Sequence, residues 1–211
     1  MSVPEQESDP RLRRTLQLVI ALNLGFFAVE FAVATAIGAV SLFADSVDFL
    51  EDTAMSLLVL AAMRLSPLMR ARIGFGLAGV LLAPVIAFLA TLAHKFTAAV
   101  PHAPEPLPFA LTGLAALAVN ATCALLLARV RHAGGSLTRA AFLSARNDMI
   151  ANLAIMAAAG LTALWPSIWP DIVVGLGIAG LNADAAKEIW AAARREHGAA
   201  LAARDGGGEA P

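Results

Sequence analysis

The sequence predicts an all-α membrane protein with six transmembrane helices and with both termini in the cytoplasm. Hydrophobic residues make up 59% of its 211 residues and charged residues only 15%, whereas a soluble domain carries about 25% charged residues. The mean hydropathy is +0.73. Long apolar stretches recur along the chain, and every second loop between them carries Arg, so that these loops fall on one side. Together these observations indicate a chain that crosses a lipid bilayer several times.

The apolar stretches are each close to the roughly 20 residues that a helix needs to cross the hydrocarbon core. The first is too long for a cleaved signal peptide, contains Glu30 and is followed by further apolar stretches. Residues 14–195 are therefore predicted to form one six-helix membrane domain. The predicted spans are Leu16–Val40, Leu42–Met63, Ile73–Leu92, Leu107–Leu127, Ala140–Leu164 and Ile172–Ala193.

The two ends of the chain are predicted to be disordered cytoplasmic segments, residues 1–13 and 196–211. The first is polar and acidic, and the second ends in a Gly-rich run. About 18 residues follow the sixth span, which are too few to form a further folded domain.

The orientation follows from the basic residues, because short cytoplasmic loops are enriched in Arg and Lys. They precede the first span, join spans two and three, join spans four and five, and follow the sixth span. Only Lys95 falls on the opposite side. The residues on the predicted cytoplasmic side are Arg11, Arg13, Arg14, Arg64, Arg70, Arg72, Arg129, Arg131, Arg139, Lys187, Arg194, Arg195 and Arg204.

Polar residues inside two of the spans point to a function. Asp48 and Asp52 are four residues apart in the second span, and Ser144, Asp148 and Asn152 repeat that interval in the fifth. Residues four apart share one face of a helix, and carboxylates at bilayer depth are rare and usually functional. The two spans run in opposite directions and carry these residues away from their ends. Facing each other, they offer an oxygen-rich site that suits a divalent cation better than an organic substrate.

The run from Gly38 to Asp52 resembles the start of the second helix in cation diffusion facilitators, a family of metal/proton antiporters with six membrane helices. In that family this helix supplies two metal ligands four residues apart, and Asp48 and Asp52 match the version with two aspartates. The fifth helix of the family supplies a second pair, commonly His and then Asp. Those positions fall on Ser144 and Asp148, so the resemblance implies a metal site between helices two and five.

The resemblance extends to Asn23 and Glu30 in the first span and to Trp169–Leu176 at the start of the sixth. Two departures stand out. Ser144 replaces the usual histidine and shifts the predicted site toward oxygen ligands. The residues that follow the sixth span are also expected to be too few for the cytoplasmic metal-binding domain that commonly follows the sixth helix in this family. A homodimer, which is common in this family, would here depend on contacts within the membrane.

Each of the polar residues within the spans also suits a structural role. Asp48, Asp52 and Asp148 have a possible partner in Arg146. Ser144 and Asn152 suit helix packing as well as metal binding. Three further residues, namely Asn23, Asn120 and Glu30, suit hydrogen bonds between helices. For Asp45 and Glu51 we expect hydration near the outer interface, with an outward vestibule as the alternative. Cys123 is expected to be a small buried hydrophobe.

The predicted function is efflux of a divalent transition metal, zinc, cobalt or cadmium, in exchange for protons, across a bacterial inner membrane. No resident cofactor and no nucleic-acid partner are indicated. An enzyme is not expected, because no histidine lies within a span to activate a nucleophile and no phosphate-binding loop is present. Two alternatives remain: a non-transporting structural or regulatory partner with the same fold, and a proton-linked carrier for another small cation.

Overall fold

The computed structural model describes residues 10–62, 82–97, 102–130 and 135–181, together with a few residues between 69 and 76 and between 190 and 198. All regular secondary structure in these residues is helical, as the sequence predicts. The helices are α1 (Pro10–Ile37), α2 (Val40–Ala62), α4 (Leu82–Thr97), α5 (Pro106–Val130) and α6 (Gly135–Leu164), followed by an apolar helix at Trp169–Leu181. We refer to the last of these as the 169–181 helix.

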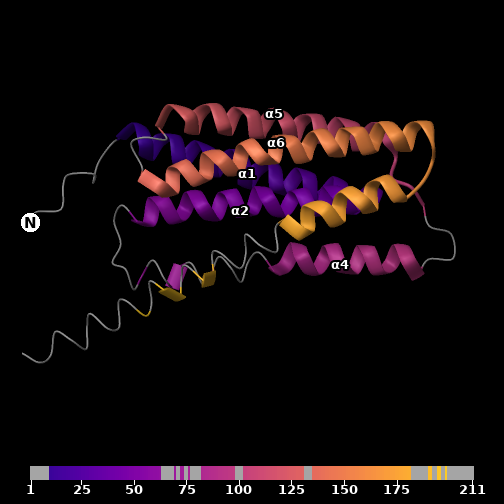
Figure 1. Ribbon diagram of the computed structural model, residues 1–211, viewed down its shortest axis with the longest axis horizontal. Helices are drawn as coiled ribbons and strands as arrows, with labels where there is room; N and C mark the ends of the chain where they lie inside the picture. The colour runs from indigo at the N-terminus through magenta and orange to yellow at the C-terminus, as the bar shows by residue number, and fades with distance from the viewer. Residues whose placement is uncertain are drawn as a thin grey trace, which may run out of the picture.

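Three of the described helices are long and apolar enough to cross a membrane: α1, α5 and residues Ser144–Leu164 of α6. The helix α2 is also of spanning length, but it carries Asp45, Asp48, Glu51 and Asp52. It lies alongside the other long helices, parallel to their common axis (Figure 1). The chain is thus an integral membrane protein with an all-α fold.

Several helix boundaries in the structure differ from the predicted ones. The helix α1 begins at Pro10, so residues 10–13, predicted as part of a disordered segment, are helical, and Leu12 is buried. The third span was predicted to end at Leu92, but α4 continues to Thr97. The helix α6 begins at Gly135, five residues before the predicted start. Residues 1–9, 77–81, 182–189 and 199–211, which include parts of the third and sixth predicted spans and of the two predicted tails, lie outside the described residues.

The break between the first two helices has a local cause. Gly38 has a φ of 65°, a left-handed conformation that glycine adopts without strain. The amide of Ala39 donates to the carbonyl of Ala34 at 3.1 Å, which closes the helix in a Schellman-type turn. Consequently α1 ends at Ile37 rather than at the predicted Val40, and α2 begins immediately afterwards.

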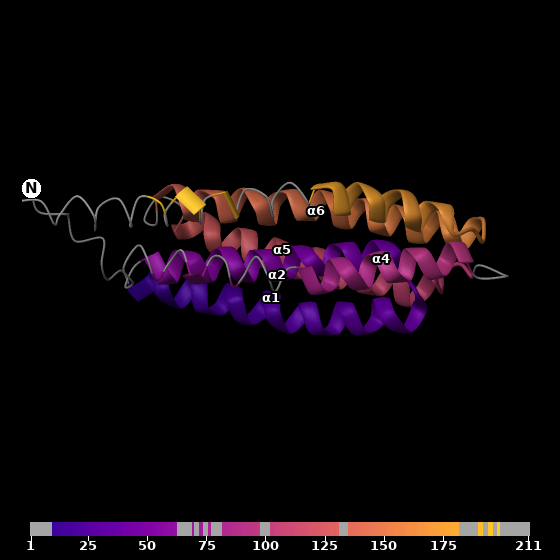
Figure 2. The same cartoon turned by 90° about the horizontal axis from the view of Figure 1, so that it is seen from below.

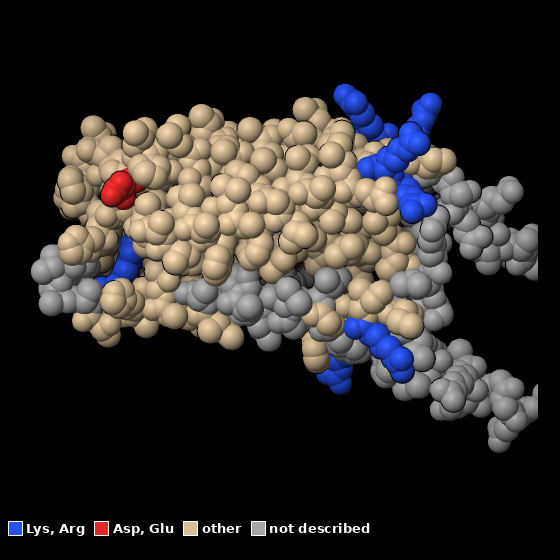
Figure 3. All heavy atoms as spheres, turned by 180° about the vertical axis from the view of Figure 1, so that it is seen from behind, with Lys and Arg blue, Asp and Glu red and all other residues tan. Residues whose placement is uncertain are grey.

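Four helices form the body of the molecule. Contacts join α1 to α2, α2 to α6, α6 to α5 and α5 to α1, and α4 packs against α2. Figures 1 and 2 show these helices running side by side along one long axis. Most basic side chains gather at one end of the molecule, and the described residues in the middle of the face shown in Figure 3 include no charged side chain. The side of the membrane on which that basic end lies stays a prediction.

Two apolar clusters occupy opposite ends of this four-helix body. The first, which we call the Phe43 cluster, consists of residues near the turn between α1 and α2 and their neighbours: Ala34, Ala39, Val40, Leu42, Phe43, Ala44, Phe88, Phe109, Ile155, Ala158, Ala159, Ile172 and Ile178. The second, the Leu16 cluster, consists of Leu12, Leu16, Val19, Val59, Cys123, Ala124, Leu127, Val130, Ala141 and Ala145. Cys123 is fully buried, as predicted.

The 169–181 helix approaches α2 closely enough to require a glycine. A Cβ at position 175 would lie 2.9 Å from the backbone nitrogen of Ser41 and 3.0 Å from the backbone carbon of Val40. Because backbone atoms cannot move aside as a flexible side chain can, Gly175→Ala is expected to lower the free energy of unfolding by about 1–3 kcal/mol. Denaturant titration in detergent micelles measures this loss. The matched control is Gly177→Ala, which meets nothing within 4 Å, and an equal loss in both variants would contradict the prediction.

Candidate functional site

A layer of buried polar side chains separates the two apolar clusters. Along each of the four helices it lies between residues of the Phe43 cluster and residues of the Leu16 cluster. Every member has at most 8% of its surface exposed. We call this the polar layer; it consists of Asn23 and Glu30 from α1, Asp45, Asp48 and Asp52 from α2, Asn120 from α5 and Asn152 from α6.

The predicted pair on α2 lies within this layer. Asp48 is 8% exposed and Asp52 is 3% exposed. The hydroxyl of Thr53, the neighbour of Asp52, donates to the backbone carbonyl of Phe49 at 2.8 Å and is therefore not directed at these carboxylates. One oxygen of Asp52, Oδ1, is buried and has no hydrogen-bond partner in the part of the chain that the structure describes. This oxygen is thus available to a ligand that brings its own positive charge.

Two of the predicted residues on α6, Ser144 and Asp148, interact with the pair on α2. The hydroxyl of Ser144 is a hydrogen-bond partner of the Asp52 carboxylate. The carboxylate of Asp148 is close enough to those of Asp48 and Asp52 for electrostatic repulsion. The two helices therefore bring together the residues that the sequence analysis placed on facing stripes. The negatively charged carboxylates of Asp48, Asp52 and Asp148 repel one another there, and a bound cation or proton would reduce this repulsion.

Asn152 lies one turn beyond Asp148 and is fully buried. Its Nδ2 donates to the backbone carbonyl of Asp148 at 2.8 Å, whereas its Oδ1 has no hydrogen-bond partner among the residues described. The side chain is therefore anchored through its nitrogen and keeps a free acceptor oxygen.

No group of three or more His, Cys, Asp or Glu side chains in the described part of the chain is gathered tightly enough to hold a metal ion. A metal bound between α2 and α6 would therefore have to draw the aspartates closer together. The predicted alternative partner, Arg146, is exposed. Among the described residues it forms no ion pair with Asp48, Asp52 or Asp148, so these acids are not neutralised by it.

The family model of the cation efflux transmembrane domain matches residues 16–194, which is most of the chain. The protein belongs to the cation efflux family. This membership confirms the family resemblance noted in the sequence, and members of this family are cation transporters rather than enzymes. A search of curated proteins found no match.

One acid of this cation efflux protein, Asp45, lies where the sequence analysis did not expect it, and its partner is Glu30, for which a contact between helices was expected. Asp45 was predicted to be hydrated near the outer interface, but it is fully buried and so is Glu30. Their carboxyl groups contact each other at hydrogen-bonding distance. Among the described residues none of the four oxygens has a hydrogen-bond donor, and two ionised carboxylates can only accept. Such a contact becomes a hydrogen bond only when one of the two groups carries a proton.

Lys95 is a second correction. It was assigned to a loop on the outer side, but it lies in the last turn of α4 and is buried. Its Nζ forms an ion pair with Asp171 Oδ2 at 2.7 Å. The sequence held two signals for this pair. One is a single Lys on the side that otherwise lacks basic residues, and the other is Asp171, which follows Trp169 and Pro170.

Proposed function

We propose that this protein exports a divalent transition-metal ion, namely zinc, cobalt or cadmium, in exchange for protons. The observation that supports this most directly is that Asp48 and Asp52, which belong to the polar layer on α2, lie opposite the partly buried Asp148 on α6 within a cation efflux domain. Acidic residues within the membrane mark ion pathways in general.

The proposed ligands are the carboxylates of Asp48, Asp52 and Asp148. Ser144 or Asn152 completes the shell. Ser144 already contacts Asp52, and Asn152 Oδ1 has no competing donor. Carboxylate oxygens bind zinc at about 2.0–2.2 Å. The set lacks the nitrogen and sulfur ligands that soft metals prefer, which disfavours monovalent copper.

Proton exchange follows from the same groups. A carboxylate must lose its proton to bind a metal, so metal binding releases protons and protonation releases the metal. Protons entering from the outer side would therefore expel the ion there. The contact between Glu30 and Asp45 offers protons a second place to bind in the polar layer, apart from the proposed metal ligands.

The experiment that tests this function uses the purified protein in proteoliposomes. Metal entry and internal pH are followed together with two fluorescent indicators while zinc, cobalt or cadmium is added. We expect metal movement coupled to proton movement in the opposite direction for at least one of these ions. No flux with any divalent ion would contradict transport and favour the non-transporting structural or regulatory partner. Flux of monovalent ions alone would favour a carrier for another small cation.

Ser144 offers a test of the ligand set. Replacing it with His places an imidazole next to Asp52, in the pattern common in the family, so Ser144→His is expected to tighten zinc binding by about tenfold or more, on the scale of single metal-site substitutions. Isothermal titration of the protein in micelles measures this change. The control is Thr122→His on α5, an exposed position whose hydroxyl bonds only its own helix. Equal zinc affinity in Ser144→His and in the unaltered protein would place Ser144 outside the site.

A further inference from the structure

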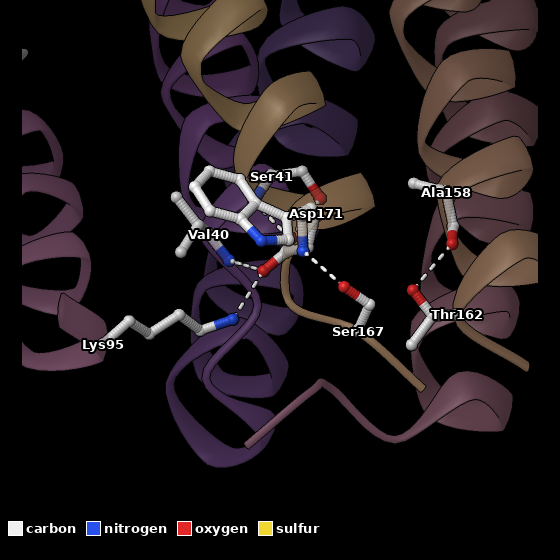
Figure 4. Close-up of polar contacts among 8 residues, drawn as sticks. Val40, Ser41, Lys95, Ala158, Thr162, Ser167 and Asp171 are labelled. Carbon is white, nitrogen blue, oxygen red and sulfur yellow. Dashed lines mark hydrogen bonds and ion pairs between the residues drawn. The ribbon is translucent and has the colours of Figure 1, made fainter. Parts of the chain in front are cut away.

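The carboxylate of Asp171 connects three helices, namely α2, α4 and the 169–181 helix, and we call this contact the junction. Asp171 is fully buried in the first turn of the 169–181 helix. Its Oδ1 accepts hydrogen bonds from the backbone N–H and the hydroxyl of Ser41, each at 2.8 Å. Its Oδ2 accepts from the backbone N–H of Val40 at 2.8 Å and from Lys95 Nζ at 2.7 Å. Figure 4 shows Lys95 and Val40 converging on this carboxylate.

The two backbone donors are the first N–H groups of α2. A helix leaves these groups without partners inside the helix, and a nearby side chain usually satisfies them. Here an aspartate from a helix 130 residues further along the chain does so. The carboxylate also complements the positive end of the α2 dipole. The start of α2 is thus bonded to the 169–181 helix rather than only to its own turn.

Two further features fix the distance between the 169–181 helix and the start of α2. Gly175, one turn after Asp171, lets the two backbones touch. Lys95 neutralises Asp171 in an apolar surrounding and ties the end of α4 to the same carboxylate. Separating the carboxylate from α2 would leave buried backbone donors without partners, which is unfavourable in a membrane interior. This junction is therefore the part of α2 that is least free to move.

We propose that Asp171 is a positioning residue for metal transport: it fixes the start of α2 and thereby sets the height and rotation at which α2 presents Asp48 and Asp52 to α6. Asp48 follows Val40 by eight residues, or about 12 Å along the helix. A rigid helix fixed at its start transmits any displacement of that start to both aspartates. This inference rests on the proposed function, because it concerns the site between α2 and α6.

The test compares Asp171→Glu and Asp171→Asn in the full chain. Asp171→Glu keeps the charge and the partner of Lys95 but lengthens the side chain by one methylene, so it displaces the start of α2. Asp171→Asn removes the charge and one acceptor. We expect the dissociation constant for Zn²⁺, measured by isothermal titration, to rise about 10–100-fold in both variants, as for residues that support metal ligands indirectly. Ser41→Ala, which retains both backbone bonds, should have a smaller effect.

Two controls separate positioning from a general loss of structure. Glu105→Gln removes an exposed acid that precedes α5 and should leave Zn²⁺ binding unchanged. The thermal unfolding midpoint of each variant is recorded in parallel. A lower midpoint with an unchanged dissociation constant for Zn²⁺ in Asp171→Glu would show a purely structural role and overturn the proposal. If either Asp171→Glu or Asp171→Asn fails to fold, the remaining variant is compared with the unaltered protein in the same two measurements.

Hydrogen exchange keeps the inference separate from the proposed function. The amides of Val40 and Ser41 should exchange at least tenfold faster in Asp171→Asn than in the unaltered protein, a readout that needs no metal. If the unaltered protein binds no divalent ion while these amides lose protection in the variant, the proposed function fails and the link between Asp171 and α2 stands. If their exchange is unchanged in the variant, the link itself is refuted.

Discussion

Replacing Asp52 with Ala is expected to abolish metal transport, and Asp48→Ala is expected to do the same. Both carboxylates are buried in the polar layer and oppose Asp148, so neither has a substitute within the described helices. Loss of a residue that only supports a metal ligand costs about 10–100-fold in affinity, and loss of a ligand should exceed about 100-fold. Isothermal titration with Zn²⁺ and metal uptake by proteoliposomes measure the two effects.

The controls for this prediction separate chemistry from packing. Asp52→Asn and Asp48→Asn keep the size of each side chain and remove its charge, so they should lose metal binding while the thermal unfolding midpoint stays close to that of the unaltered protein. Glu105→Gln alters an exposed acid outside the polar layer and should transport normally. Full transport by Asp48→Ala or by Asp52→Ala would exclude the proposed site.

The arrangement between α2 and α6 was predictable because two simple rules act together there. The 3.6-residue period of a helix fixes which side chains share a face, and the high cost of a carboxylate in lipid restricts that face to the protein interior. Asp48 and Asp52 on one helix, and Ser144 and Asp148 on the other, therefore had to point inward. The structure places Ser144 against Asp52, which spacing alone did not determine.

Contacts between distant residues were not predictable in the same way. Hydropathy places Asp45 in α2 and Glu30 in α1, but which helices are neighbours, and at what depth two side chains meet, depends on packing in three dimensions. The pairing of Lys95 with Asp171 has the same origin, since the partners are separated by 76 residues. The early end of α1 arose instead from backbone conformation at Gly38, because an apolar run does not mark a left-handed residue within it.

The contact between Glu30 and Asp45 leads to the second large effect, on proton coupling. Two buried carboxyl groups in contact with no donor nearby need a proton between them. Asp48 on α2 repels Glu30 of this pair electrostatically, and Asp45 of the pair repels Asp148 on α6. When Asp48 and Asp148 bind a metal, their charge is neutralised and the electrostatic field on the pair changes, so the proton on the pair is coupled to the metal.

Glu30→Gln and Asp45→Asn are therefore expected to retain Zn²⁺ binding but to lose transport driven by a pH gradient. An amide in place of one carboxyl donates a permanent hydrogen bond to the other, which preserves packing and removes the exchangeable proton. We expect uptake driven by a pH gradient to fall more than about fivefold, which corresponds to the coupling of about 1 kcal/mol that is common between contacting residues. Proteoliposomes with a preset internal pH, loaded with a zinc indicator, measure the uptake rate.

A double-variant cycle makes this prediction sharper. If Glu30 and Asp45 hold one shared proton, then either single substitution already removes it, and the double variant Glu30→Gln with Asp45→Asn should be no slower than the slower single variant. If the two acids act independently, their effects should instead multiply. Multiplying effects, or uptake at the unaltered rate in both single variants, would show that the pair does not carry the exchanged proton. In that case the coupling must reside in Asp48, Asp52 and Asp148, whose competition between metal and protons would then account for the whole exchange.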